Sequence, residues 1–410
     1  MKRIYYIALA IILLCGCDSF LDVTPKGMLL PEKVQDFDEM IGDSRNPSAA
    51  YPLAEMCSDN LYMTEELLTG RIMSAQGKAY TWQEEFYLTE EDDATWNNAY
   101  EIIYTCNLVL QETPGAKEGS DADKARVMAE ARLNRAFYYW YLHSCYAPAY
   151  NPESISVYHI PRMAAFGLAA RVNLFFGNYD AALENAEEAL KLNNNLVDYN
   201  TFSFKNEEKP SGGINNRPIP MESPEMIMYR SSGFQSVLSS CCMSPELLDL
   251  FDTDADLRYK FNFTMLDRSG KPIDEPYPLF LQELDYNIGV PEMMLIKAEC
   301  LARKKDPNAL KVLDELREKR IATDKYTALP EVSGDKLLEI VLEERQRELV
   351  YNGVRFFDMK RLAKEGIYTR TLTRQFKETT YTLEPNSNRY MFPIAAKVRI
   401  LNNNIEQNPR

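Results

Sequence analysis

The chain has 410 residues, of which 61 are acidic and 46 basic, so its formal net charge is -15. This surplus of negative charge opposes sequence-independent binding to nucleic-acid phosphates. Hydrophobic residues make up 45% of the chain and charged residues 26%, which is the balance of a globular protein rather than of a disordered or multispanning membrane protein. Tyrosine is unusually frequent, with 25 residues, so amphipathic rings are available for binding surfaces.

The N-terminal segment reads as an export signal. Lys2 and Arg3 precede an apolar stretch over residues 4–14, which is too short to span a bilayer of about 30 Å as a helix. Gly16 then precedes Cys17, as a small residue does in the lipobox of bacterial lipoproteins. We therefore predict a signal peptide over 1–16, acylation of Cys17, and a lipid anchor and entry segment over 17–30. The alternative is an ordinary secretory signal that is cut elsewhere.

Helical periodicity dominates the remaining chain. Apolar residues recur at spacings of three and four from Trp96 to Leu110, and a Gly177-Asn178 turn separates two helical patterns whose second carries three alanines on one face. Such pairs match the tetratricopeptide pattern. We expect residues 31–410 to form a single, mostly α domain, a solenoid of tetratricopeptide-like helix pairs. The expected helical segments are about 94–146, 165–193, 291–320 and 335–364.

The segment from about 199 to 290 differs from these helical segments because prolines and glycines interrupt it repeatedly. This composition prevents long helices and predicts a loop-rich, partly irregular region. Loops held on a rigid scaffold often carry function. We therefore expect the ligand-binding region here and in residues 51–91.

A search for catalytic chemistry finds no nucleophile elbow, phosphate-binding loop or zinc-protease motif. The acidic run that begins at Asp252 resembles the start of a calcium loop, but Leu257 stands where that loop needs glycine. Six cysteines outside the N-terminal segment show no metal-ligand spacing, and we favour packing over disulfides for them. No catalytic residue, metal or cofactor is predicted. A surface glycoside hydrolase or peptidase would need two carboxylates in a cleft, or a metal.

Several motifs together resemble the SusD/RagB family of outer-membrane lipoproteins. They are the entry Cys17 to Asp22, Ser58-Asp59-Asn60, the helix from Trp96 to Leu110 with Asn107, the segment Ala129 to Phe137, Leu295 to Glu299, Glu344 to Leu349 with Gly353 to Arg361, and the tail from Met391 to Pro409. The C-terminal block is the most specific of them. The chain departs from the family near residues 150–161, where a helix pair is expected to be missing, so it resembles a shortened member.

The resemblance implies a cell-surface, lipid-anchored protein of the outer membrane that is not an enzyme. It implies that the protein binds an oligosaccharide, or in some members a peptide, and passes it to a SusC-like TonB-dependent barrel. A pure adaptor that binds the barrel without a small ligand is a further alternative.

Ligand residues are predicted from chemistry rather than from the family motifs. Sugar rings stack on exposed aromatic faces beside amide, guanidinium or carboxylate groups. Trp82 lies in a loop-like stretch and is the first candidate. The full set of candidate ligand-binding residues is Trp82, Tyr80, Tyr62, Arg71, Tyr277 and Phe234.

Overall fold

The computed structural model describes residues 31–44, 51–148, 162–229, 231–232, 240–266, 271–279, 284–285 and 287–410. The predicted signal peptide, the acylation site Cys17, the segment at 150–161 and Phe234 lie outside these residues. Within them, no helix is both long and apolar enough to cross a membrane. The predicted fold class is confirmed, since helices dominate and they pack in pairs.

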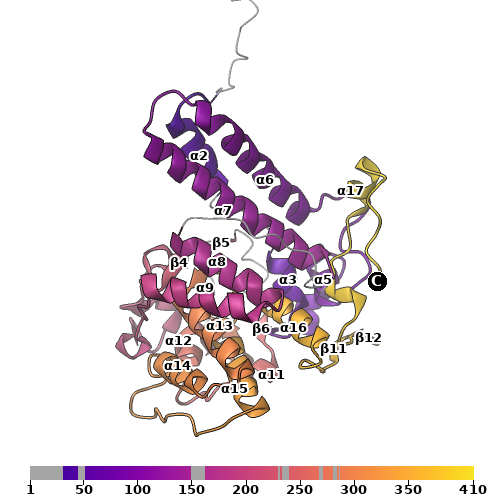
Figure 1. Cartoon of the computed structure of the whole chain (residues 1–410). Helices are drawn as coiled ribbons and strands as arrows, with labels where there is room; N and C mark the ends of the chain where they lie inside the picture. The colour runs from indigo at the N-terminus through magenta and orange to yellow at the C-terminus, as the bar shows by residue number, and fades with distance from the viewer. Residues whose placement is uncertain are drawn as a thin grey trace, which may run out of the picture.

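Three helices form an arm at the top of Figure 1: α2 (Val34–Ser44), α6 (Ala94–Glu112) and α7 (Asp121–Tyr146). Ser120 starts α7 with a capping box, because its hydroxyl accepts from the Asp123 backbone N–H while the Asp123 carboxylate accepts from the Ser120 backbone N–H. The arm has its own small core of Val34, Phe37, Ile41, Cys106, Val109, Val127 and Ala131. That core holds α2 against the long α6–α7 pair.

The stacked pairs follow below the arm in Figure 1. They are α8 (Arg162–Phe175) with α9 (Tyr179–Leu192), α13 (Val290–Arg303) with α14 (Asn308–Arg317), and α15 (Asp335–Glu348), which packs on α13 and α14 and is followed by α16 (Arg355–Lys364). Gly177 takes the left-handed conformation, φ 77°, that the α8–α9 turn requires. Ala182, Ala186 and Ala189 of α9 are fully buried, so the neighbouring helices approach closely.

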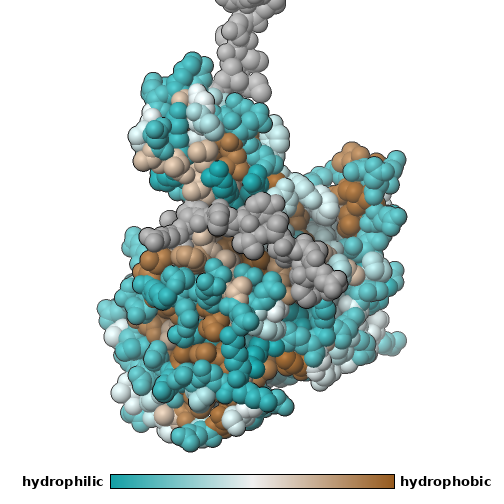
Figure 2. All heavy atoms as spheres, in the orientation of Figure 1, coloured by the Kyte–Doolittle hydropathy of each residue, from teal (hydrophilic) through white to brown (hydrophobic). Residues whose placement is uncertain are grey.

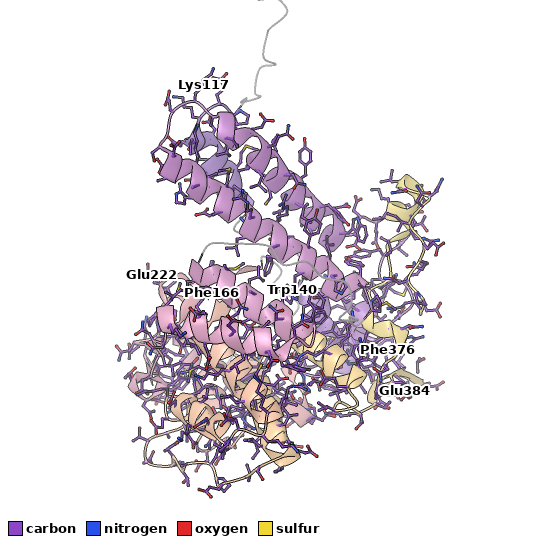
Figure 3. All side chains as sticks on the ribbon, viewed as in Figure 1. Lys117, Trp140, Phe166, Glu222, Phe376 and Glu384 are labelled. Carbon is purple, nitrogen blue, oxygen red and sulfur yellow. The ribbon has the colours of Figure 1, made fainter. Side chains whose placement is uncertain are left out.

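The central junction is aromatic. Trp140 of α7 lies where α7 meets α8 (Figure 3), with its ring centroid 5.5 Å from that of Phe357 and 6.5 Å from that of Phe175. His143 packs its ring 5.2 Å from Phe176, and burial lowers its pKa to about 4. His143 thus contributes to the packing of this junction. The six described cysteines are buried and form no disulfide.

Short elements complete the structure. The short helices are α3 (Tyr51–Cys57), α4 (Glu65–Thr69), α5 (Ala75–Tyr80), α11 (Pro245–Leu248), α12 (Leu257–Asn262) and α17 (Ala396–Leu401). The 3-10 turns are η2 (Thr113–Gly115), η4 (Tyr199–Thr201), η5 (Pro210–Gly212), η6 (Pro220–Glu222) and η7 (Asn388–Tyr390). Hydrophilic residues cover most of the face in Figure 2, although Ile400 and Leu401 of α17 are exposed.

Each described strand pairs antiparallel with one partner. The pairs are β1 (Leu61–Tyr62) with β6 (Cys242–Met243), β2 (Ser203–Phe204) with β3 (Ile214–Asn215), β4 (Met226–Met228) with β10 (Ile288–Gly289), β5 (Ser231–Ser232) with β9 (Leu284–Asp285), β7 (Phe263–Leu266) with β8 (Pro272–Pro278), and β11 (Leu372–Phe376) with β12 (Thr379–Leu383). The predicted loop-rich region thus contains short strand pairs and one-turn helices.

The charged residues of the C-terminal block, Glu344 to Leu349 and Gly353 to Arg361, have structural roles. They form ion pairs within their own helix and also with residues far away in the sequence. Glu344 does pair with Arg347 three residues on, at 2.7 Å, but it also pairs with buried Arg258 of α12 at 2.7 Å. Arg361 of α16 bonds both carboxylate oxygens of Glu299 on α13, at 2.6 and 2.8 Å. Helices far apart in the sequence are therefore joined by buried ion pairs.

Candidate functional site

A cavity of about 350 Å3 lies beside β1 and β11. We call it the β11 cavity. It is lined by Asp59, Leu61, Tyr62, Tyr80, Ser244, Pro245, Glu246, Arg370, Thr371, Leu372, Thr373, Arg374, Gln375 and Thr380. Its volume is within the range of roughly 300–1,000 Å3 that is typical of small-ligand sites.

Tyr62 gives the cavity an accessible ring. In β1 the side chains alternate, so Leu61 is buried while Tyr62 is 37% exposed. Pairing of Tyr62 with Cys242 on β6 fixes the backbone that carries the ring. Partial burial, with the nearby Glu275 carboxylate, raises the pKa of Tyr62, so the hydroxyl stays protonated at neutral pH and can donate a hydrogen bond.

Arg374 of β11 fixes the inner wall. Its guanidinium lies 3.7 Å from the centroid of the Tyr80 ring and 4.1 Å from that of the Trp82 ring. It donates to the backbone carbonyls of Met56, Ser58 and Tyr80. Burial lowers the pKa of Arg374, but these carbonyls and ring faces stabilise the cation.

The charges around the cavity are paired. Glu246 and Arg370 form an ion pair at 2.6 Å on the exposed rim. Buried Asp59 accepts two hydrogen bonds from Arg355, at 2.6 and 2.8 Å, and the attraction of that guanidinium lowers the pKa of Asp59 against the effect of burial. With two acids and two arginines in its lining, the cavity is electrically balanced and suits a neutral, hydroxyl-rich ligand better than an ion.

Trp82 was expected to be an exposed stacking ring, and the structure contradicts this. Its side chain has no exposed surface, and its indole Nε1 donates to the Cys57 carbonyl at 2.9 Å. The residues just before it form helix α5 rather than a loop. With Arg374 against its ring, Trp82 supports the inner wall and cannot contact a ligand.

Some of the other predicted ligand residues line the β11 cavity and some do not. Tyr80 lines the cavity but is 2% exposed, and its hydroxyl accepts from the Met63 backbone N–H at 3.0 Å, so it cannot serve as a stacking ring. Arg71 follows α4 and lies outside the lining, as does Tyr277 on β8, opposite Thr264. The structure therefore brings Tyr62 and Tyr80 together at the cavity, with Arg71 and Tyr277 outside it.

Glu246, Arg370 and Arg374 were not predicted from the sequence. They come from segments with no recognisable motif, and their role depends on pairing between strands and helices far apart in the chain. The threonines beside them supply hydroxyls, of which Thr380 donates to Gln375 at 2.6 Å. Nothing local in the sequence could have indicated that these groups meet.

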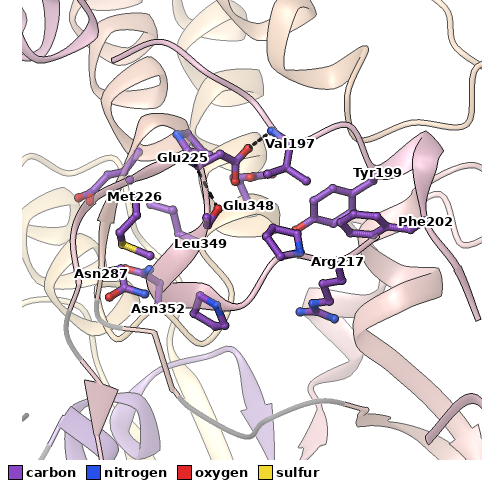
Figure 4. A pocket seen from close by; sticks show the side chains of 16 residues that line it. Val197, Tyr199, Phe202, Arg217, Glu225, Met226, Asn287, Glu348, Leu349 and Asn352 are labelled. Atoms are coloured by element: carbon purple, nitrogen blue, oxygen red, sulfur yellow. Dashed lines mark hydrogen bonds between the residues drawn. The ribbon is translucent and has the colours of Figure 1, made fainter. Parts of the chain in front are cut away.

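A second cavity, of about 190 Å3, lies between η4, the start of α13 and the end of α15 (Figure 4). Tyr199 and Phe202 stack at 4.7 Å between ring centroids, and the Arg320 guanidinium lies 4.4 Å from the Tyr199 ring centroid. Glu225 and Glu348 both pair with Arg320, at 2.7 and 2.9 Å. Because Tyr199 already packs against both Phe202 and Arg320, this smaller cavity offers a sugar less ring surface than Tyr62 does.

The described residues hold no group of three or more metal-ligating side chains. The cavity carboxylates, Asp59 and Glu246, are each bound to an arginine. Because Arg355 lowers the pKa of Asp59, Asp59 does not match the raised-pKa acid that glycoside hydrolysis uses. The arrangement can bind a ligand through one ring, hydroxyls and paired charges.

Two family models match parts of the chain. The model described as "SusD family" matches residues 290–410, and the model described as "Starch-binding associating with outer membrane" matches residues 19–163. No curated protein sequence matches the chain significantly.

Solved structures share the fold. A SusD superfamily protein from Bacteroides thetaiotaomicron aligns with a TM-score of 0.68 and 16% identity, over 92% of this chain and 100% of that one. A SusD-like carbohydrate binding protein from Bacteroides vulgatus aligns with a TM-score of 0.62 and 18% identity, over 91% and 97%. Surface glycan-binding protein A from Bacteroides uniformis aligns with a TM-score of 0.63 and 16% identity, over 91% and 99%. At these identities the likeness establishes the fold alone.

Proposed function

Because the chain belongs to the SusD/RagB family, we propose that it is a non-catalytic glycan-binding protein of the outer-membrane surface. In this proposal Cys17 carries the lipid anchor, and the bound oligosaccharide passes to a SusC-like TonB-dependent barrel. The N-terminal family model describes starch-binding proteins that associate with the outer membrane, which supports both the ligand class and the location.

The observation that carries the proposal is the accessible Tyr62 ring in a charge-balanced cavity of about 350 Å3. An aromatic face packs against sugar C–H groups, while threonine hydroxyls and the Glu246–Arg370 pair can exchange hydrogen bonds with sugar hydroxyls. The net charge of -15 disfavours acidic polysaccharides at long range. A neutral glycan therefore fits best.

The test uses the chain from residue 18 onward, a truncation that removes no described element. Calorimetric titration with neutral tetrasaccharides of the malto, cello, manno and xylo series identifies a binder. Replacing Tyr62 by Ala should then weaken that binding by about 1–3 kcal/mol, the range expected for a central aromatic anchor. The matched control, Tyr62→Phe, keeps the ring and should retain most of the affinity.

Two outcomes would contradict the proposal. Release of new reducing ends from the bound glycan would make the protein an enzyme. Binding of peptides but of no glycan in the same titrations would make it a peptide binder. Copurification of the acylated full chain with a barrel from outer membranes tests the delivery step separately.

A further inference from the structure

Three exposed tyrosines lie on the arm and belong to the lining of neither cavity. Tyr100 and Tyr104 of α6 are 44% and 69% exposed, and Tyr139 of α7 is 51% exposed. Tyr139 lies close enough to Tyr100 to contribute, after burial, to raising the pKa of Tyr100. We call these three residues the tyrosine shelf.

Polar groups extend the shelf along the same face of the α6–α7 pair. Arg135 Nη1 donates to Asn107 Oδ1 at 2.8 Å. Asn107 lies three residues after Tyr104 on α6, and Arg135 four residues before Tyr139 on α7, so helical spacing places this pair beside the rings. Rings next to an amide and a guanidinium form a combination that contacts sugars through both C–H faces and hydroxyls.

The Tyr100 ring of the shelf is held by packing against α6. Trp96 packs its ring 5.1 Å from Tyr100 and 5.1 Å from buried Tyr146. With a rise of 1.5 Å per residue, Tyr100 and Tyr104 lie roughly 6 Å apart along the α6 axis. A row of rings at this spacing suits a linear chain of sugar units, and packing of Tyr100 reduces the side-chain freedom that this ring loses on binding.

The two helices that carry the shelf expose no large aliphatic side chain. Among the described residues, the exposed large aliphatic side chains are Met73, Leu88, Leu192, Ile219, Met265, Ile367, Ile400 and Leu401. None of them lies on α6 or α7. Exposed rings with polar neighbours, but without exposed leucine, isoleucine or methionine, favour a glycan over a protein partner.

We propose that the tyrosine shelf is a second glycan-contact surface, which binds extended neutral polysaccharide in addition to the shorter segment held in the β11 cavity. This inference rests on the proposed function and deepens it, because it assigns long chains rather than free oligosaccharides as the natural ligand. Two contact regions on one polymer raise the apparent affinity by making the second contact intramolecular.

The test compares a polymer with a short oligosaccharide of the same sugar. The double variant Tyr104→Ala/Tyr139→Ala is examined by affinity electrophoresis in gels with soluble starch, galactomannan or arabinoxylan, and by calorimetry with the matching tetrasaccharide. We expect polymer affinity to fall at least tenfold and tetrasaccharide affinity to stay within twofold. The control Tyr104→Phe/Tyr139→Phe keeps the rings and should bind the polymer like the unchanged protein.

Unchanged polymer affinity in a double alanine variant with an unchanged thermal midpoint would overturn the shelf while leaving the proposed function intact. If the double alanine variant no longer copurified with the barrel but still bound the polymer, the shelf would be a protein interface. That result would also overturn the proposal. Failure of the unchanged protein to bind any glycan would instead refute the proposed function itself.

Discussion

At the scale of single residues, the guanidinium of Arg374 organises the wall of the β11 cavity. It packs against the rings of Tyr80 and Trp82 and donates to three backbone carbonyls around α3 and α5. A lysine at this position would present a point charge that cannot stack or reach all three carbonyls. We expect Arg374→Lys to lower the free energy of unfolding by about 2–3 kcal/mol.

Urea denaturation measures this loss as a lower midpoint with an unchanged slope. The matched control is Arg370→Lys on the same cavity, whose rim ion pair is half exposed and should contribute less than about 1 kcal/mol. Equal stabilities for the two variants would contradict the role assigned to Arg374.

Glu55 makes stability depend on pH. It is fully buried, accepts from Asn60 Nδ2 at 2.8 Å, and its pKa is raised to about 7, chiefly by burial. Below about pH 4.5 the carboxyl is protonated in both the folded and the unfolded chain. As pH rises to 7, the unfolded chain releases this proton while the folded protein retains it, so stability falls by up to about 3 kcal/mol.

The variant Glu55→Gln is neutral at every pH and keeps the acceptor for Asn60. Relative to the unchanged protein, its free energy of unfolding should be similar near pH 4.5 and higher by up to about 3 kcal/mol at pH 8. Chemical denaturation of both proteins at the two pH values measures this. A stability difference that does not change with pH would rule out the raised pKa of Glu55.

The burial of Trp82 could not be predicted from the residues next to it in the sequence. Its neighbours Lys78, Tyr80 and Thr81 gave no clear helical period, and the residue that covers its ring, Arg374, lies almost 300 residues later in the chain. Tyr62, which was predicted to bind ligand because it lies in the same segment as Trp82, lines the cavity and is partly exposed, and its contact with a ligand remains a prediction. Burial of a ring by a distant partner has no local signal.

At the scale of elements, the helix pairs were predictable because their contacts are local. Alanines at helical spacing and the Gly177 turn specify the α8–α9 pair within about 30 residues of sequence. The short strand pairs were not predictable. β1 pairs with β6, and the cavity forms only when β11 approaches α4, so these elements depend on partners far along the chain.

The sequence pattern predicts the order of the helices along the chain. Buried ion pairs join helices that are far apart in that order. Glu299 of α13 bonds Arg361 of α16 in bidentate fashion, and Arg361 also bonds Asp358 at 2.8 Å. Replacing Glu299 by Gln leaves a buried guanidinium without a full counter-charge. We expect a loss of about 3–5 kcal/mol in the free energy of unfolding.

Chemical denaturation of Glu299→Gln tests this value against Glu339→Gln as the control. Glu339 pairs with Lys336 on the exposed face of α15 and should contribute little. A Glu299→Gln protein as stable as this control would show that the pair does not hold α13 to α16.

At the scale of the whole molecule, stacked helices hold the arm and the β11 cavity in fixed positions. The acidic surface, the paired charges in the cavity and the rings of Tyr62 and the tyrosine shelf all favour neutral polymers of hydroxyl-rich units. The scaffold holds these rings, as the proposed binding of a glycan requires. Among the described residues, no group of three or more His, Cys, Asp or Glu side chains could hold a metal ion.

The most direct test of this account is calorimetric titration of the chain from residue 18 onward with a neutral tetrasaccharide that it binds, followed by chromatographic analysis of the recovered sugar. The account predicts saturable binding, an affinity loss of about 1–3 kcal/mol in Tyr62→Ala but not in Tyr62→Phe, and intact sugar at the end. Unchanged binding by Tyr62→Ala, or recovery of shorter sugars, would contradict it.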